Sequence, residues 1–366
     1  MDFALPDELE KLRLEAEEVA VAAAADLEIK EDSWINSHDR AFSEELGDRG
    51  WLGMTWPKEY GGGERTALER FLVFEAMIAN GAPIAATWFC DRQMGPSLLA
   101  FGTEDQKRRF LPDMIAGKAA WCIGMSEPDS GSDLASLRTR AERDGDDFVI
   151  NGQKVWTSFA ALADYCYLIC RTNPEGKAHQ GLSELIVPMD TPGIEVRPIT
   201  DMTTNSHFCE VMFDDVRVPA SNLVGELNGS WKQTMSQLEH ERGGIDRLLS
   251  NRALYRDSLP RADMADPRIR QEVAALESFY RIGRHLILRE VLGQAPKGWS
   301  ALTKTAATTF EQRVAEFCAR VHGPETMLWN RVSRAVCYAP AYTIMGGTNN
   351  VLRNIIGDRM LGLPRG

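Results

Sequence analysis

The sequence lacks the features that mark membrane and exported proteins. Its 366 residues contain no uncharged apolar run near the roughly 20 residues that a membrane-spanning helix needs. The first residues lack the basic start and apolar core of a signal peptide. Internal repeats and low-complexity segments are also missing. We therefore expect a cytoplasmic globular protein without a membrane span.

Cysteine and histidine are scarce, which argues against a disulfide-rich protein and against a metal-binding protein. The seven cysteines are odd in number and include no Cys-x-x-Cys pair, and the six histidines are scattered. This pattern is typical of reduced thiols rather than a disulfide framework. Cys166 and Cys170 lie in an apolar run and are expected in the core. No cluster has the spacing of metal ligands, so we expect no metal.

Positive charge is in deficit. Lys and Arg number 41 against 53 Asp and Glu, a net charge of −12, which argues against nucleic acid as the main partner. A polyanionic ligand would need locally concentrated arginine or lysine. With 44% hydrophobic and 26% charged residues, the composition is otherwise ordinary. A single core rarely grows past about 250–300 residues, so we expect two or three domains.

The local patterns divide the chain into three parts. Up to about residue 118 the pattern is helical, with Pro6-Asp7-Glu8 at a helix start and a Thr103/Gln106 capping box. Short β-branched and aromatic runs then alternate with turn signals at Asp144-Gly145 and Asn151-Gly152, which suggests a small barrel or sandwich. After Gly225 helices return, at about 267–294, 299–321 and 324–334. We predict an α+β multidomain fold: a helical domain (1–118), a β domain (119–224) and a helical bundle (225–366).

The segment Trp121–Asp133 is the first candidate for a binding site. An apolar run ends at Pro128, and a proline that ends a strand leaves backbone N–H groups without ladder partners. Ser126, Ser130 and Ser132 add hydroxyl groups. Such a loop suits a ligand with a heteroaromatic edge and phosphates, although loops of this composition are more often plain turns.

The order of two motifs resembles the acyl-CoA dehydrogenase family. Met125-Ser126-Glu127-Pro128-Asp129-Ser130-Gly131-Ser132-Asp133 is followed by a predicted hairpin and then by Asn151-Gly152-Gln153-Lys154-Val155-Trp156-Thr157-Ser158. In that family the first motif binds the flavin's pyrimidine edge and touches the CoA chain, and the second packs on the flavin near N5. The resemblance implies FAD as cofactor, contacted by Met125, Ser126, Gly131, Ser132, Trp156 and Ser158. Ser132 is also implied as an acyl-CoA contact.

The implied reaction is α,β-dehydrogenation of an acyl-CoA thioester to a trans-2-enoyl-CoA, in which a carboxylate removes the α-proton. Many family members carry this glutamate in a Glu-Gly-Thr motif, where this sequence has Gly346-Gly347-Thr348. A smaller branch carries it on the helix after the β domain, directly before an arginine, as in Glu241-Arg242. The resemblance therefore makes Glu241 the base and Arg242 a substrate contact.

The residues alone leave Glu241 open to two interpretations. It lies in an apolar stripe at helical spacing formed by Trp231, Met235, Leu238, Ile245 and Leu248. A carboxylate there is costly unless it is paired or used, and a structural ion pair is the commoner outcome. The resemblance favours catalysis, with a raised pKa. It also implies that the Gly346 N–H polarises the thioester carbonyl and that Gly347, Thr348 and Asn350 contact the adenosine side of FAD.

One family contact is missing. The Arg-x-x-Phe-Gly segment that reaches a neighbouring subunit's FAD is not recognisable after Ser250. Either an arginine among Arg252, Arg256 and Arg261 replaces it, or an unlike subunit does. His240-Glu241-Arg242 with Gly346-Gly347-Thr348-Asn349 resembles an actinobacterial branch that includes steroid side-chain dehydrogenases, some of them heterotetramers.

We therefore expect a tetramer, as a homo-oligomer or with a related subunit, that passes electrons to an electron-transfer flavoprotein. Its place would be in β-oxidation of fatty acids or steroid side chains. Gly243-Gly244 in a helix interior favours a bulky or branched acyl group, or else tight helix packing. The alternatives are a non-catalytic partner subunit and a flavin oxidase or monooxygenase on the same fold.

Overall fold

The computed structural model describes residues 5–242 and 244–364, with the backbone alone for 239–242. The chain divides into two compact units. One comprises residues 38–64 and 85–238, and the other comprises residues up to 37, 65–84 and those from 239 onward. The predicted boundaries at 118 and 224 remain predictions. Among the described residues, no helix is both long and apolar enough to cross a membrane.

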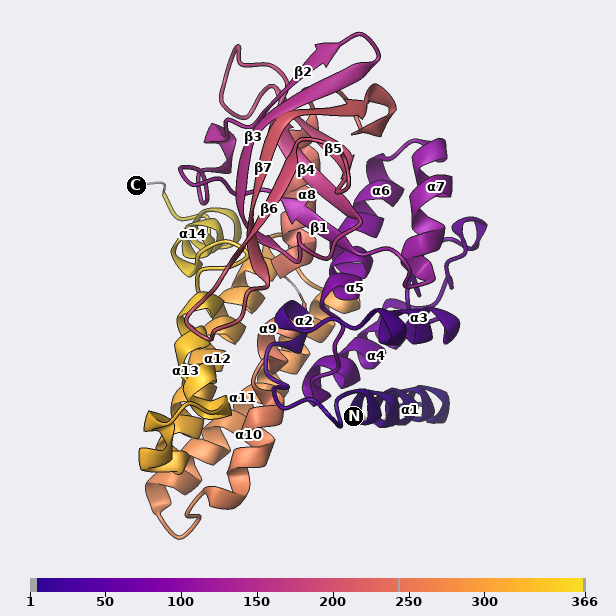
Figure 1. Ribbon diagram of the computed structural model, residues 1–366. Helices are drawn as coiled ribbons and strands as arrows, with labels where there is room; N and C mark the ends of the chain where they lie inside the picture. The colour runs from indigo at the N-terminus through magenta and orange to yellow at the C-terminus, as the bar shows by residue number, and fades with distance from the viewer. Residues whose placement is uncertain (1–4, 243, 365–366) are drawn as a thin grey trace. The chain divides into compact units, whose positions relative to one another are not determined.

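The first unit is built on one sheet of eight strands (Figure 1). The strands pair in the order β6-β7-β3-β2-β4-β5-β8, and β1 pairs with β4 in parallel. Their bounds are β1 (Trp121–Gly124), β2 (Arg140–Asp144), β3 (Asp147–Ser158), β4 (Tyr165–Arg171), β5 (Leu182–Pro188), β6 (Ile194–Ile199), β7 (Phe208–Pro219) and β8 (Leu223–Val224).

The two turn signals had different outcomes. Asp144-Gly145 joins β2 to β3, as predicted. Asn151-Gly152 lies inside β3, so the second turn prediction was wrong. The register against β7 shifts between Ile150 and Gly152, where Gly152 has φ 146°. A Cβ on Gly152 would lie 2.7 Å from Thr139 Cα, so the glycine marks a bulge with a close backbone approach.

The core of this unit is apolar and includes the predicted cysteines. Cys166 and Cys170 are fully buried beside Phe148, Ile150 and Val187. All seven cysteines of the chain are free thiols.

Helices complete the unit: α3 (Arg40–Asp48), α5 (Ala85–Phe89), the π-helical turn η2 (Cys90–Met94), α6 (Gly95–Phe101), α7 (Glu104–Ile115) and the first part of α8 (Ser230–Arg242). The Thr103/Gln106 capping box at the start of α7 is confirmed. The same Gln106 side chain donates to the carbonyls of Ser221 and Leu223, at 2.7 and 2.8 Å, and so attaches α7 to the sheet.

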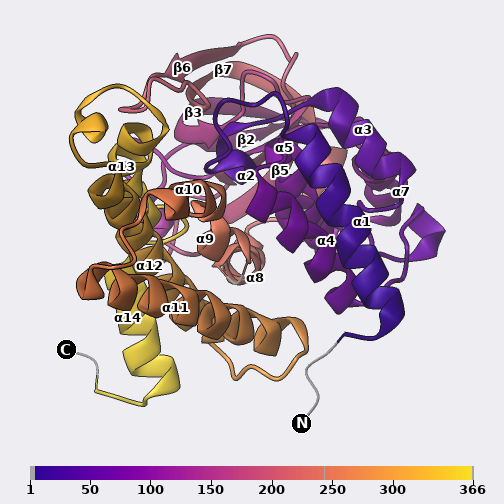
Figure 2. The same cartoon turned by 90° about the horizontal axis from the view of Figure 1, so that it is seen from below.

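The second unit is helical (Figure 2). It contains α1 (Asp7–Ala23), α2 (Ser33–Asn36), α4 (Ala67–Asn80), α9 (Asp246–Leu249), α10 (Arg252–Ser258), α11 (Pro267–Val291), α12 (Trp299–His322), α13 (Arg331–Tyr342) and α14 (Asn349–Ile355). The long helix α12 packs against α11, α13 and α14. The predicted helix at 324–334 was wrong. A 3₁₀ turn (Gly323–Met327) occupies its start, and α13 begins at Arg331 because the Asn330 side chain accepts the N–H groups of Val332 and Ser333.

The predicted helical stripe around Glu241 is interrupted. α8 ends at Arg242 and α9 begins at Asp246, so Ile245 and Leu248 do not continue the α8 stripe. A Cβ on Gly244 would lie 1.9 Å from Asp246 Oδ1, and Asp246 is fully buried. Gly244 therefore lies between helices rather than inside one, and close packing explains it. Gly243 lies outside the described residues.

Candidate active site

The loop after β1 is the first part of the candidate site. β1 ends at Gly124, earlier than the predicted end at Pro128. The backbones of Glu127 and Ser130 bond to each other, at 2.9 and 3.0 Å, and place Pro128 in an exposed turn. Met125 and Ser126 are half-buried, and the Ser126 carbonyl accepts the Val155 N–H of β3 at 2.9 Å. Gly131 and Ser132 are exposed, and a Cβ on Gly131 would meet nothing within 4 Å.

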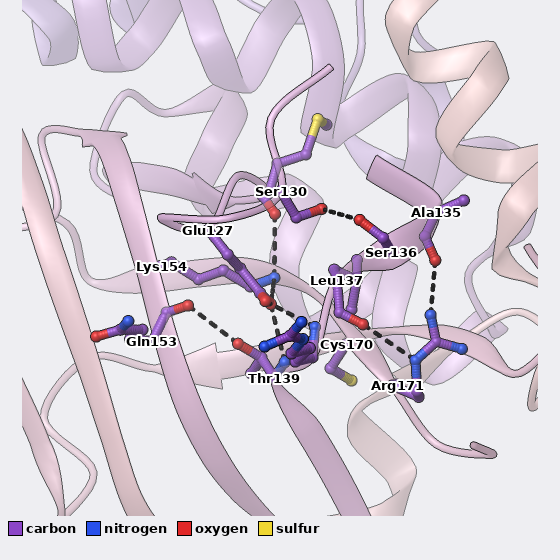
Figure 3. A network of polar contacts seen from close by, with 12 residues as sticks. Glu127, Ser130, Ala135, Ser136, Leu137, Thr139, Gln153, Lys154, Cys170 and Arg171 are labelled. Carbon is purple, nitrogen blue, oxygen red and sulfur yellow. Dashed lines mark hydrogen bonds and ion pairs between the residues drawn. The ribbon is translucent and has the colours of Figure 1, made fainter. Parts of the chain in front are cut away.

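Other loop hydroxyls are used within the protein (Figure 3). Ser130 is buried, and its Oγ donates to the Asp133 carbonyl at 2.6 Å. Ser136 Oγ donates to Ser130 Oγ and to the same carbonyl. Arg171 of β4 donates to the carbonyls of Ala135 and Leu137, at 2.7 and 3.0 Å. The structure therefore gives Ser130 a loop-stabilising role, while Ser126 and Ser132 stay candidates for ligand contact.

A buried ion pair lies beneath this loop, and no pattern in the sequence predicts it. Lys154 Nζ is 2.9 Å from Glu127 Oε1 and donates to the Met125 carbonyl at 3.0 Å (Figure 3). The Glu127 carboxylate also accepts the N–H groups of Arg138 and Thr139, at 2.6 and 2.9 Å. Burial opposes ionisation of Glu127, but the Lys154 ammonium and these N–H groups outweigh it and lower the pKa of Glu127. Burial lowers the pKa of Lys154, and Glu127 offsets part of that effect.

Trp156 is exposed on a bulge of β3. The register against β7 shifts between Lys154 and Thr157, and Trp156 has φ 60°, a left-handed conformation that costs energy for a large side chain. Its side chain is 57% exposed and lies edge-on to Phe208, with ring centroids 5.9 Å apart. Ser158, half-buried, pairs with Phe208 at the end of the strand. A strained backbone that exposes a flat apolar ring is typical of a binding surface.

These residues fit an isoalloxazine ring. Trp156 offers a flat face for stacking, and Ser126 and Ser158 offer hydroxyl groups that can donate or accept at the polar edge of the ring. The open space at Gly131 leaves the loop accessible to a ligand. The assignment of individual flavin contacts, Met125 and Ser132 included, stays a prediction.

The glycine-rich segment of the helical unit forms a second candidate part. Gly346 and Gly347 have φ 65° and 87°, in the left-handed region that favours glycine. The Thr348 hydroxyl accepts the Val351 N–H and caps α14. Lys304 is fully buried and donates to the Gly347 carbonyl and to Asn349 Oδ1, at 2.9 and 3.0 Å. Asn350 is exposed, and its Oδ1 accepts from Arg353.

The buried face of α8 is mostly polar, which corrects part of the predicted apolar stripe. Leu238 is buried as predicted, but Trp231 and Met235 are only half-buried, whereas Gln233, Thr234 and Gln237 are buried. The reason is Glu184 on β5, which is fully buried. Its carboxylate accepts from Tyr167, Gln233, Thr234 and Gln237 at 2.7–3.2 Å. Burial raises the pKa of Glu184 to about 7.

The predicted base lies near the end of this helix. Glu241 follows Gln237 by four residues, so the helical repeat places both positions on one face of α8. The side chains of Glu241 and Arg242 lie outside the described residues. Their roles stay predictions.

The three candidate arginines each have a partner within the helical unit. Arg252 donates to Glu277 at 3.1 Å, Arg256 to Asn80 at 3.0 Å and Arg261 to Glu325 at 2.6 Å. A pyrophosphate contact by any of them would compete with these bonds.

The fold, with one unit built on a β-sheet and one helical unit, and a candidate site that fits a flavin point to the class of flavin-dependent dehydrogenases. Comparison with known families gives the same result. Residues 6–118, 122–216 and 228–361 match the family domains described as acyl-CoA dehydrogenase, N-terminal, middle and C-terminal domain. The chain belongs to the acyl-CoA dehydrogenase family. It is an FAD-dependent acyl-CoA dehydrogenase, as the sequence motifs implied.

Similar proteins include several mycobacterial enzymes. The chain is 38% identical over 341 residues to acyl-CoA dehydrogenase IpdE1 of Mycobacterium tuberculosis, covering 89% of this chain and 88% of that protein. It is 35% identical over 356 residues to FadE26 of the same organism, covering 88% and 87%. Among solved structures, the Tcur3481-Tcur3483 steroid ACAD has a TM-score of 0.90 at 32% identity, and the ChsE4-ChsE5 complex from M. tuberculosis has 0.87 at 31%. Both matches cover 100% of each chain.

Proposed function

We propose that this acyl-CoA dehydrogenase oxidises thioesters with a bulky or branched acyl group, such as a steroid side chain, to the trans-2-enoyl-CoA, and that Glu241 is its base. The observation that carries the proposal is the distribution of carboxylates. The family resemblance implies that Gly346 stands where many members have their glutamate, and that Glu241 stands where a smaller branch has it. A glutamate at position 346 would also have to adopt the left-handed conformation that Gly346 has.

The roles of the chain's own residues follow from the chemistry. Bound FAD supplies the acceptor for the β-hydrogen, which leaves as hydride. Glu241 removes the α-proton, and the Gly346 N–H donates to the thioester oxygen where negative charge grows. The hydrogen bonds from α8 to Glu184 fix the helix that carries Glu241. The raised pKa expected for Glu241 from an apolar stripe has less support, because the buried residues of α8 include Gln233, Thr234 and Gln237 as well as Leu238.

The proposal of a bulky acyl group is supported by similar proteins and not by the Gly243-Gly244 pair. Gly244 lies between helices and packs against Asp246, so it gives no sign of a wide acyl pocket. The Tcur3481-Tcur3483 protein, which matches this chain over its full length, is a steroid ACAD, and this supports a bulky acyl group.

The test is anaerobic bleaching of the flavin by straight, branched and steroidal acyl-CoA thioesters. We expect the bulky thioesters to reduce the flavin faster than butyryl-CoA. If butyryl-CoA is as fast as every bulky thioester, the substrate proposal fails. If no thioester bleaches bound FAD, a non-catalytic subunit becomes the better interpretation. Stoichiometric hydrogen peroxide formed in air with each turnover would indicate an oxidase.

We also propose a tetramer in which two chains contact each flavin, with an electron-transfer flavoprotein as acceptor. Two solved relatives carry paired names, Tcur3481-Tcur3483 and ChsE4-ChsE5, and the second is a complex. Arg252, Arg256 and Arg261 already have intramolecular partners, which favours a pyrophosphate contact from an unlike subunit over one from this chain.

A further inference from the structure

Lys154, like Lys304, is a lysine with no exposed surface, and it forms an ion pair with a carboxylate that is itself buried. Lysine is almost never fully buried unless it is paired, and burying both members of an ion pair carries a large desolvation cost for each ion. An apolar pair of similar volume is often as stable or more stable. A buried Lys154–Glu127 pair is therefore poorly explained by stability alone.

The contacts of the pair connect three pieces of backbone. Lys154 Nζ binds the Met125 carbonyl and the Glu127 carboxylate at the start of the loop. The same carboxylate accepts two N–H groups where the loop returns to β2, those of Arg138 and Thr139. Lys154 itself lies at the last regular position of β3 before the bulge that exposes Trp156. Figure 3 shows Lys154 and Thr139 on the two sides of the Glu127 carboxylate that they bind.

We propose that Lys154, through Glu127 and the Met125 carbonyl, is a positioning residue that sets the Met125–Ser126 backbone relative to Trp156. This inference rests on the proposed assignment of those residues to the flavin. Lys154 and Glu127 touch no ligand themselves. They hold two groups that would bind opposite parts of one planar ring, an edge and a face, and a planar ring requires those groups at fixed spacing.

The test measures how fast the holoenzyme releases FAD after dilution. The release is detected by the fluorescence of the free FAD. The double variant Lys154→Met with Glu127→Gln removes both charges, keeps an acceptor for only one of the N–H groups of Arg138 and Thr139, and loses the bond to Met125. Loss of charge-assisted hydrogen bonds predicts release about 10- to 100-fold faster. The absorption band of the remaining bound flavin should also shift. The single variants leave one buried charge unpaired and are expected to fold poorly.

Two control variants separate positioning from general loosening. Val216→Ala opens a cavity in the same β core, where Val216 pairs with Ile150 of β3. It should lower Tm without changing FAD release or the flavin band. Trp156→Ala removes the exposed ring and should speed release if the flavin binds there.

The outcomes are distinct. Fast release in the double variant together with normal release in Val216→Ala supports the proposal. Normal release in the double variant with fast release in Trp156→Ala overturns it and leaves the flavin site intact. Normal release in both removes the flavin assignment itself. Equally fast release in the double variant and in Val216→Ala also overturns the proposal, because loosening would then explain the effect.

Discussion

At the scale of single residues, a substitution at Gly244 tests whether this glycine is needed for close packing or for a wide acyl pocket. Gly244→Ala would bring a Cβ to 1.9 Å from Asp246 Oδ1, and Asp246 is fully buried and has little room to move. Overpacking of this kind typically costs about 1–3 kcal/mol. We expect a lower Tm by calorimetry and an unchanged order of acyl-CoA preference.

Gly131→Ala is the matched control for Gly244→Ala. The added methyl group meets nothing within 4 Å, so the change in unfolding free energy should stay within about 0.5 kcal/mol. A Gly244→Ala variant that keeps its Tm but loses activity on wide thioesters would contradict the packing explanation.

Residues with a local signal were predictable, and residues with a long-range partner were not. The Thr103/Gln106 box was readable because its partners are three residues apart. Lys154 and Glu127 are 27 residues apart, and Glu184 binds Gln233 across 49 residues, so no local pattern marks either. In the sequence, nothing distinguishes the buried carboxylates of Glu127 and Glu184 from ordinary surface charges. The strain at Trp156 has no sequence signal except the motif that contains it.

At the scale of elements, the attachment of α8 to β5 through Glu184 predicts a pH dependence of stability. Burial raises the pKa of Glu184 from its ordinary 4.5 to about 7, so the folded state favours the neutral acid. Its contribution to stability is complete below pH 4.5 and is lost as the pH rises through about 7. The difference corresponds to at most about 3 kcal/mol.

The measurement compares Tm of the wild type and Glu184→Gln across about pH 5 to 8. Glutamine does not titrate, so we expect the wild type to lose more stability over this range than the variant. Asp32, whose pKa burial also raises to about 7, is present in both proteins and cancels in the comparison. Parallel Tm curves would show that Glu184 does not titrate as proposed.

Element prediction failed where tertiary contacts override periodicity. The apolar pattern of α8 predicted burial of Trp231 and Met235, but Glu184 requires donors and so the face with Gln233, Thr234 and Gln237 is buried. The end of α8 at Arg242 was missed because the i, i+3, i+4 spacing of apolar residues continues through Ile245. The long helices α11 (Pro267–Val291) and α12 (Trp299–His322), which have strong local patterns, lie close to their predicted ranges of 267–294 and 299–321.

At the scale of the whole molecule, the proposed shared flavin predicts how FAD content depends on assembly. Light scattering on this 40.8 kDa chain expressed alone should give one of two results. A tetramer with one FAD per chain indicates identical subunits. A chain with little FAD that gains it when an unlike subunit is added indicates a heteromer. A monomer that retains one FAD per chain would contradict both versions.

The most direct test of the proposed mechanism is the single-turnover rate of flavin reduction in Glu241→Gln under anaerobic conditions, with saturating acyl-CoA. The variant keeps the shape and hydrogen bonding of the side chain but not its basicity. We predict reduction slower by a factor of about 10²–10⁴, with FAD content and thioester affinity near those of the wild type. Glu239→Gln on the same helix is the matched control and should reduce its flavin at the normal rate. A Glu241→Gln enzyme that reduces its flavin as fast as the wild type would show that the base lies elsewhere.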